Sequence, residues 1–335
     1  MTDFGGKVRR WLGFRNVSAL YVFALIFLVF SVSIPDTFLT NTTWKTLLDN
    51  QAVTGLVAIA LVGPLAAGAF NLAIGVQVGA ASMLVAWLLV NQDWPIAAAV
   101  SATAAAGVLI GLVSGLLIVK ANIDSFIATV GVASLLAAFI TGISGGEQIL
   151  RVPERFSSFG SGQVLGVTYP VLVLFFLAVI VWYLLEHTPA GRRVYATGGN
   201  IEAARLAGVN TAAVIVGSLM ACGLLTSIAG VLVTAKLGNA DPTIGPGYLV
   251  PAFTAVFLGA TQFRRGRLNV WGALLAVYVL ATGVKGLQLS GAPVWIPDVF
   301  NGVALLIAVA MAKHQGNLGR GPGRRHGRST AMSVK

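Results

Sequence analysis

The chain has 335 residues, of which 56% are hydrophobic and only 10% are charged, and its formal net charge is +11. A soluble domain carries about 25% charged residues, so the composition excludes a water-soluble globular protein and indicates a membrane protein. The single cysteine, Cys222, excludes an intramolecular disulfide.

Charge-poor segments suited to bilayer-spanning helices, which need about 20 apolar residues, follow one another along the chain. There are ten, at 17–34, 51–70, 72–90, 95–119, 125–143, 167–185, 212–235, 248–260, 268–286 and 294–311. The eighth is short, and it either forms a half-helix or begins earlier, near Pro242. The sequence therefore predicts an all-α polytopic membrane protein of about ten transmembrane helices.

The second and third segments are joined without a charged residue, because residues 50–92 contain no Asp, Glu, Lys or Arg. Residues that break or bend helices fall inside this run, at Gly63, Pro64, Gly68, Asn71 and Gly75. We therefore expect a broken or re-entrant region near residues 63–75. Lipid cannot satisfy the polar groups of irregular backbone, so this region must face protein or a water-filled cavity, which indicates a solute path.

Glycines repeat every four residues in the fourth segment, at Gly107, Gly111 and Gly115. This spacing puts them on one helix face, where a neighbouring helix can approach closely. The neighbour is expected within the bundle or across a dimer interface.

Several polar residues lie at membrane depth and are candidates for the solute path: Asn71, Gln77, Thr129 and Asn301, with Ser134 and Thr254 besides. Asn71 and Gln77 rank first because they flank the broken region. A hydrogen bond between helices is the alternative role for each of them.

The longest loop between predicted spans, 186–211, contains the signals of a short helix at 201–207. Asn200 is a good N-cap, Glu202 and Arg205 suit the helix dipole at the two ends, and Gly208 suits the C-terminal position. Helices shorter than about 12–15 residues need tertiary support. The supporting surface is either the protein's own cytoplasmic face or a separate soluble protein, and the local signals favour neither.

The basic residues are distributed asymmetrically. Ten crossings put both termini on one side of the membrane. If that side is the cytoplasm, its segments hold 17 of the 22 basic residues, and the opposite side holds only Lys45, Arg151, Arg155, Lys236 and Lys285. Basic loops stay in the cytoplasm, so the distribution supports this topology, and the positive charge requires no nucleic-acid partner. The division of the chain is then a basic N-terminus (1–16), a transmembrane domain (17–312) and a disordered basic tail (313–335).

No pattern in the sequence indicates catalysis. The chain lacks the phosphate-binding pattern Gly-x4-Gly-Lys-[Ser/Thr]. His187, His314 and His326 are scattered, and no cluster of metal ligands is evident. We therefore predict no catalytic residues, no metal and no cofactor bound by this chain.

The loop sequence from Thr188 to Asn210, with Gly198-Gly199-Asn200-x-Glu202-Ala203-Ala204-Arg205 within it, resembles the corresponding loop of ribose-type ABC importer permeases. That group also includes branched-chain amino acid permeases. Further matches at 70–75, 111–118, 124–129 and 257–267 extend the resemblance over almost the whole chain. One departure is Asn71-Leu72-Ala73, where the family usually has Asp-Leu-Ser; it leaves open a different solute or a purely structural role.

The resemblance implies a permease subunit in a bacterial inner membrane, which forms the path for a sugar or a related small polar solute. Its implied partners are a cytoplasmic ATPase that binds ATP and Mg, an extracytoplasmic solute-binding protein, and a second permease subunit, identical or paralogous. The loop helix is then the ATPase-coupling element, with Gly199, Asn200, Glu202, Ala203, Ala204, Arg205 and Gly208 as its residues.

An ion-coupled secondary transporter is the main alternative. Such a transporter needs ionisable groups inside the bundle, and the predicted spans are almost bare of them. A membrane enzyme would need a catalytic cluster, and a channel would not need a docking helix.

Overall fold

The computed structural model describes residues 18–164, 166–261 and 266–318, and most of these are helical. The predicted N-terminus, 1–16, and most of the predicted tail lie outside the described residues. The last helix extends to Leu318, beyond the predicted domain boundary at 312.

The helices, in chain order, are α2 (Ser18–Ser33), α3 (Pro35–Phe38), α4 (Asn41–Ala66), α5 (Ile74–Val90), α6 (Ile96–Val119), α7 (Ser125–Ser144), α8 (Glu154–Ser161), α9 (Tyr169–His187), α10 (Pro189–Gly199), α11 (Ile201–Leu206), α12 (Thr211–Leu237), the 3-10 helix η1 (Gly245–Tyr248), α13 (Leu249–Ala260), α14 (Val270–Leu289) and α15 (Ile296–Leu318). Between α8 and α9, β1 (Gln163–Val164) and β2 (Val167–Thr168) form an antiparallel hairpin.

Each of the ten predicted segments contains a helix. Among the described residues, six helices are long and apolar enough to cross a membrane: α4, α6, α7, α9, α12 and α14. The apolar parts of α2, α5, η1 with α13, and α15 are shorter. The all-α polytopic class is therefore confirmed, while the number of crossings and the sidedness of the termini stay predictions.

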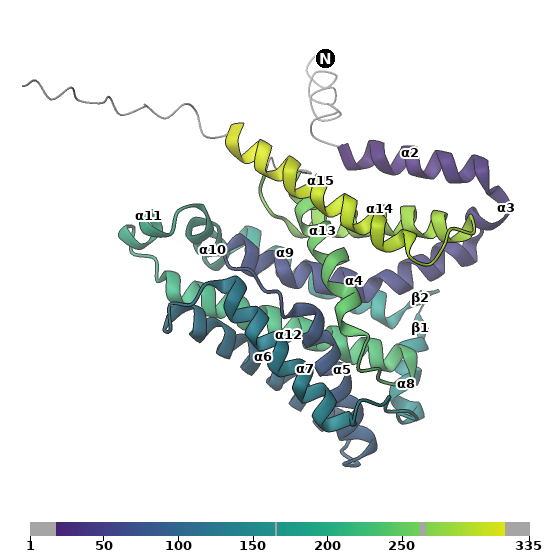
Figure 1. Cartoon of the computed structure of the whole chain (residues 1–335), viewed down its shortest axis with the longest axis horizontal. Coiled ribbons are helices and arrows are strands. Elements are labelled where there is room, and N and C mark those ends of the chain that lie inside the picture. The colour runs from purple at the N-terminus through teal and green to yellow at the C-terminus, as the bar shows by residue number, and fades with distance from the viewer. Residues whose placement is uncertain (1–17, 165, 262–265, 319–335) are drawn as a thin grey trace, which may run out of the picture.

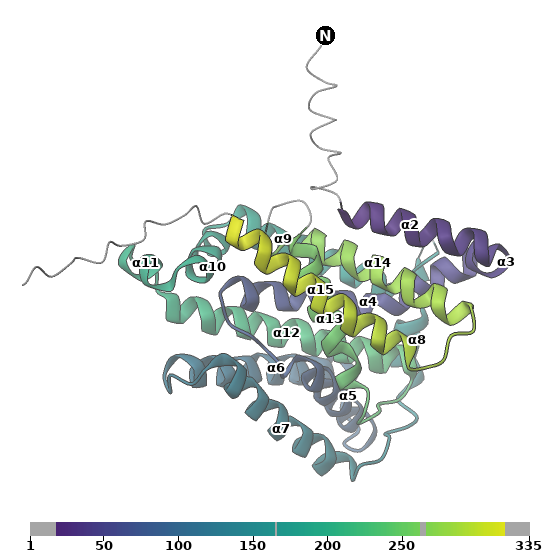
Figure 2. The ribbon, with the colours of Figure 1, turned by 45° about the horizontal axis from the view of Figure 1, so that its top comes forward.

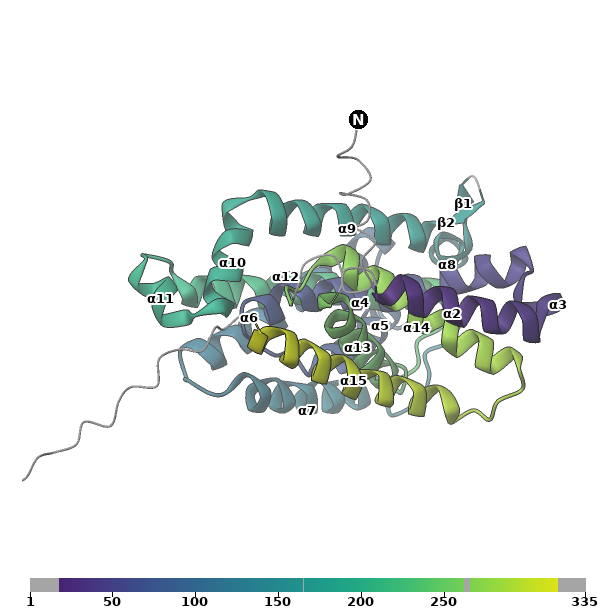
Figure 3. The same cartoon turned by 90° about the horizontal axis from the view of Figure 1, so that it is seen from above.

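The long helices run roughly along one common direction (Figures 1 and 2). Seen from above, α10 and α11 lie at one end of the bundle, and α3, α8 and the hairpin lie at the other (Figure 3). Under the predicted topology the first end is cytoplasmic and the second is extracytoplasmic.

The interior of the bundle is built around α4, α5, α12 and α14. Residues 52–62 of α4 are almost all buried, in one apolar cluster with residues of α12, α13 and α14. The outer helices expose large apolar side chains, among them Leu109, Leu135, Phe176 and Leu306. Such a surface suits lipid rather than water, as the composition predicts.

The three glycines of α6 lie against α12. A Cβ atom on Gly107 would lie 2.4 Å from the carbonyl oxygen of Gly223, and one on Gly111 would lie 2.2 Å from that of Leu219. On Gly115 it would lie 2.9 Å from the Cα of Val216. Only glycine permits this approach, so the repeat belongs to the interior of the bundle.

The second span differs most from its predicted limits. It begins at Asn41, ten residues early, where the Thr40 side chain accepts a hydrogen bond from the N–H of Thr43. Lys45 and Asp49, which indicated a loop, lie within this helix. Asp49 pairs with Lys236 at the end of α12, with Nζ 2.5 Å from the carboxylate, so its charge is compensated there. The helix ends at Ala66, four residues early.

Candidate functional site

The break between α4 and α5 is a tight turn at residues 67–73, narrower than the predicted 63–75. Gly68 adopts φ +87° and ends α4 in a Schellman motif: its N–H donates to the Leu65 carbonyl, and the Ala69 N–H donates to the Pro64 carbonyl. The turn therefore satisfies the last carbonyls of α4 within the protein.

Side chains satisfy the next N–H groups of the turn. Phe70 donates to the hydroxyl of Ser125, and Leu72 donates to that of Thr129, at 3.2 and 3.1 Å. The Ala73 N–H donates to Oδ1 of Asn71, and Nδ2 of Asn71 lies 3.4 Å from the Cys222 sulfur. The irregular backbone thus faces protein, one of the two environments expected for it.

Three of the four predicted solute residues are buried with hydrogen-bond partners. Asn71 is 3% exposed and caps the turn, and Thr129 holds its backbone. Gln77 donates to the Gly107 carbonyl at 3.5 Å, between α5 and α6. This geometry gives each a structural role, and solute contact by any of them stays a prediction.

The fourth, Asn301, lines a cavity of about 330 Å³ in which α4, η1, α13, α14 and α15 meet. Three further polar residues line the same cavity, namely Gln51, Thr54 and Tyr248. Its remaining lining includes Pro251, Val277, Leu280 and Val284. These three polar residues were not predicted from the sequence. The available signal was the pair Gln51 and Thr54, three residues apart on one face of an otherwise apolar stretch.

The opposite end of the molecule carries the predicted coupling helix, α11. It spans Ile201–Leu206, with Ala207, the last predicted residue, as its C-cap. Asn200 Oδ1 accepts from the Ala203 N–H at 3.0 Å, and Gly208 follows at φ +81°. Glu202 and Arg205 lie 3.8 Å apart and are both exposed.

The apolar face of α11 is only partly covered by the protein itself. Ala204 is buried, while Ile201 is 43% and Leu206 is 89% exposed. Neither Gly199 nor Gly208 has an atom within 4 Å of the position a Cβ would occupy. Ile201 and Leu206 therefore leave part of this short, capped helix as exposed apolar surface.

The helix α10, which the sequence analysis did not predict, connects α11 to the bundle. Thr188 caps it and Pro189 occupies its first turn. A Cβ on Gly198 would lie 2.0 Å from the Ala66 carbonyl oxygen, at the end of α4. The end of α10 therefore rests directly on the helix end that precedes the broken turn.

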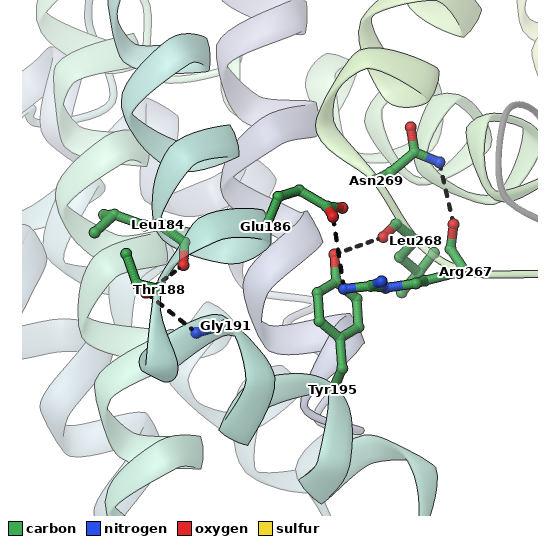
Figure 4. Close-up of polar contacts among 8 residues, drawn as sticks. All are labelled: Leu184, Glu186, Thr188, Gly191, Tyr195, Arg267, Leu268 and Asn269. Carbon is green, nitrogen blue, oxygen red and sulfur yellow. Dashed lines mark hydrogen bonds and ion pairs between the residues drawn. The ribbon is translucent and has the colours of Figure 1, made fainter.

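A second contact holds the α9–α10 corner against the turn before α14 (Figure 4). The guanidinium of Arg267 lies 3.7 Å from the ring centroid of Tyr195, and an amino group of Arg267 lies 3.8 Å from the carboxylate of Glu186. The Tyr195 hydroxyl donates to the Leu268 carbonyl at 2.8 Å. We call Glu186, Tyr195 and Arg267 the corner cluster.

Asn269 fixes the same turn to α13. Its Nδ2 donates to the carbonyls of Gly259 and Arg267, and its Oδ1 accepts from the Gly272 N–H at 2.6 Å, which caps α14. The corner that carries α11 is therefore connected to the start of α14, whose later turns line the cavity with Asn301.

Comparison with known proteins identifies the family. Residues 45–309 match the family described as branched-chain amino acid transport system / permease component. The ribose import permease protein of Escherichia coli K12 is 31% identical over 305 residues, which are 90% of this chain and 94% of that protein.

Two further relatives are similar over most of their length. The ribose import permease protein of Bacillus subtilis is 34% identical over 290 residues, 86% of this chain and 90% of that protein. The L-arabinose ABC transporter permease protein of Azospirillum brasilense is 29% identical over 309 residues, 92% of this chain and 90% of that protein. No solved structure matches.

The chain therefore belongs to this permease family and is a multi-pass transport subunit of a bacterial inner membrane. The resemblance inferred from the loop sequence is confirmed. The choice between an ABC importer permease and an ion-coupled secondary transporter is decided for the permease, and nothing found favours the alternative.

Proposed function

We propose that this chain forms the membrane path of an ABC importer for a neutral sugar of monosaccharide size. The relatives named for ribose and L-arabinose support this solute class. The observation that carries the import mechanism is α11, a capped helix at the cytoplasmic end whose Leu206 side chain is 89% exposed. In the proposed arrangement, residues 17–312 form the transmembrane domain, with both termini cytoplasmic.

The partner of α11 is a separate ATPase subunit, which binds ATP and Mg and seats this helix in a surface cleft. Ile201 and Leu206 supply the apolar anchor, while Glu202 and Arg205 supply exposed charges beside it. Asn200, Ala203, Ala204 and the glycines 199 and 208 maintain the shape of the helix and its ends. The proposal thus takes a separate soluble protein, and not the chain's own cytoplasmic face, as the surface that supports the short helix.

Two further partners complete the importer. A second permease subunit, identical or paralogous, forms the other half of the path. An extracytoplasmic binding protein delivers the solute to the end with α8 and the hairpin. There, Gln148 donates to Asp241 at 2.7 Å and a bridge pairs Ile149 with Ala240, so residues 148–149 and 240–241 join the two loops. Glu147 and Glu154 add negative charge on the same side.

The test is purification of the tagged chain from its native host, with the soluble ATPase detected by mass spectrometry and quantified. We expect the wild-type chain to retain a stoichiometric ATPase and Leu206→Asp to lose it, because a buried aspartate in the ATPase cleft has no partner. Leu237 is also exposed, and it is the last residue of α12, at the end of that helix far from α11. Leu237→Asp is therefore the matched control, and we expect it to retain the ATPase. A wild-type chain that carries no nucleotide-binding subunit, even after cross-linking, contradicts the proposal.

A further inference from the structure

The cavity lined by Gln51, Thr54, Tyr248 and Asn301 combines polar side chains with an uncharged, apolar wall. We propose that this cavity, within a single subunit, is a contact site for the transported solute, and that it selects neutral polyhydroxylated molecules by hydrogen bonds from these four side chains. The inference rests on the proposed import function and names residues for it.

The hydrogen bonding of these four side chains supports the proposal. None of the four side chains forms a hydrogen bond with another described residue. Most buried threonines in this bundle bond to the carbonyl four residues earlier; Thr103, Thr226 and Thr282 do so at 2.7–2.8 Å. Thr54, which is only 8% exposed, does not. The polar atoms of the four side chains line the cavity, so water or a solute in the cavity must supply their hydrogen bonds.

The cavity lies toward one end of the bundle. Gln51 lies in the first half of α4 and Thr54 at its midpoint, while Tyr248 ends η1, directly before the start of α13. Asn301 lies in the second turn of α15, and Val284 lies in the second half of α14. In the predicted topology all four of these helix halves are extracytoplasmic. The cavity is therefore on the side from which an importer receives its solute.

The lining of the cavity is uncharged. No residue that lines the cavity is charged, and neither Lys285 nor Asp298, its neighbours in sequence, belongs to the lining. Asp49, one turn from the cavity on α4, is already paired with Lys236 and accepts from the Thr168 hydroxyl. A zwitterionic amino acid would bring two charges to groups that offer no counter-charge, which is costly at membrane depth. Amides and hydroxyls can instead both donate to and accept from a sugar.

Size and shape agree with this solute class. A volume of about 330 Å³ lies at the small end of ligand sites, which span about 300–1,000 Å³. The ring of Tyr248 and the aliphatic wall from α14 provide the apolar surface that accompanies polar groups in such sites.

Cysteine labelling tests whether the cavity is filled by water or by lipid. Because Cys222 is the only cysteine, Cys222→Ala provides a background without reactive thiols. In membranes treated with a water-soluble, membrane-impermeant thiosulfonate, we expect Asn301→Cys to be labelled. Val303→Cys is the control. Val303 follows Asn301 by two residues, so it lies about 3 Å further along α15 and on the opposite face of the helix, where it is 50% exposed. We expect this variant to stay unlabelled. Equal absence of labelling at both positions overturns the proposal.

Uptake by the complete importer tests the selectivity, with radiolabelled D-ribose, L-arabinose and D-galactose as sugars and L-leucine as the zwitterion. We expect Thr54→Val and Asn301→Ala to lower sugar uptake about two- to tenfold each, the effect of one lost hydrogen bond, and Thr54→Ser to restore it. Val303→Ala retains wild-type uptake. Wild-type sugar uptake that Thr54→Val and Asn301→Ala leave unchanged overturns this site alone. A wild-type importer that takes up L-leucine and no sugar overturns the proposed function itself.

Discussion

Replacing Arg267 with alanine is expected to loosen the corner that carries α11. The substitution removes three contributions to the stability of this corner. The cation–π contact with Tyr195 contributes about 1 kcal/mol at a partly exposed site. The ion pair with Glu186 contributes about 0.5 kcal/mol at 3.8 Å. Glu186, whose side chain is 7% exposed, loses this cation, which costs about 1 kcal/mol more. The sum is about 2.5 kcal/mol, or roughly a 70-fold shift in local opening.

Trypsin reports this opening, because its cleavage sites Arg192 and Arg193 lie on α10 itself. When opening and closing are fast, the cleavage rate follows the population of the open form. We expect Arg267→Ala to raise cleavage at these sites about 70-fold, and Tyr195→Phe, which loses the hydrogen bond to the Leu268 carbonyl, about fivefold. Lys120→Ala is the control and removes an exposed charge elsewhere on the predicted cytoplasmic side. Identical cleavage rates for Arg267→Ala and Lys120→Ala refute the reasoning.

Thr129→Val removes the acceptor of the Leu72 N–H, so we expect a loss of about 1–3 kcal/mol in thermal unfolding of the solubilised protein, and Thr129→Ser keeps wild-type stability. Gly111→Ala brings a Cβ against the Leu219 carbonyl and is expected to cost a similar amount in the same assay, whereas Gly217→Ala meets open space and is neutral. Hydrogen bonds from the hydroxyl and the N–H of Thr243 lower the pKa of Asp241 below its usual value of 3.8, and the hydrogen bond from Gln148 lowers it further. Because folding lowers this pKa, the ionised Asp241 stabilises the folded loop fully at any pH above the pKa of the unfolded state. This stabilisation is lost only as the pH falls through the pKa of the folded state. Loop order, followed by protease resistance of residues 145–168, should therefore be constant from pH 7 to about 5.

The sequence predicted the helical segments well because each is a long apolar run, and this signal is local. The prediction failed where a residue far along the chain determines whether a segment is helical. Lys45 and Asp49 indicate a loop on their own, yet α4 includes both, since Lys236 compensates Asp49 from far along the chain. Pro189, Gly191 and Gly198 also indicate a loop. The Thr188 cap followed by proline was the signal for α10, and tight packing on Leu185 and Ala66 is what requires those glycines.

The candidate solute residues show a different limit. Polar residues at membrane depth can be found by inspection, and Asn71, Gln77, Thr129 and Asn301 were found in this way. Whether such a residue is available to a solute depends on whether the fold already satisfies it. Asn71 and Thr129 already accept hydrogen bonds from the backbone of the turn at residues 67–73, and Gln77 already donates to a carbonyl of α6. Asn301 reaches a cavity in which the side chains of Gln51, Thr54 and Tyr248 likewise have no hydrogen-bond partner among the residues that the structure describes. That distinction depends on contacts between helices distant in sequence, so only the tertiary structure provides it.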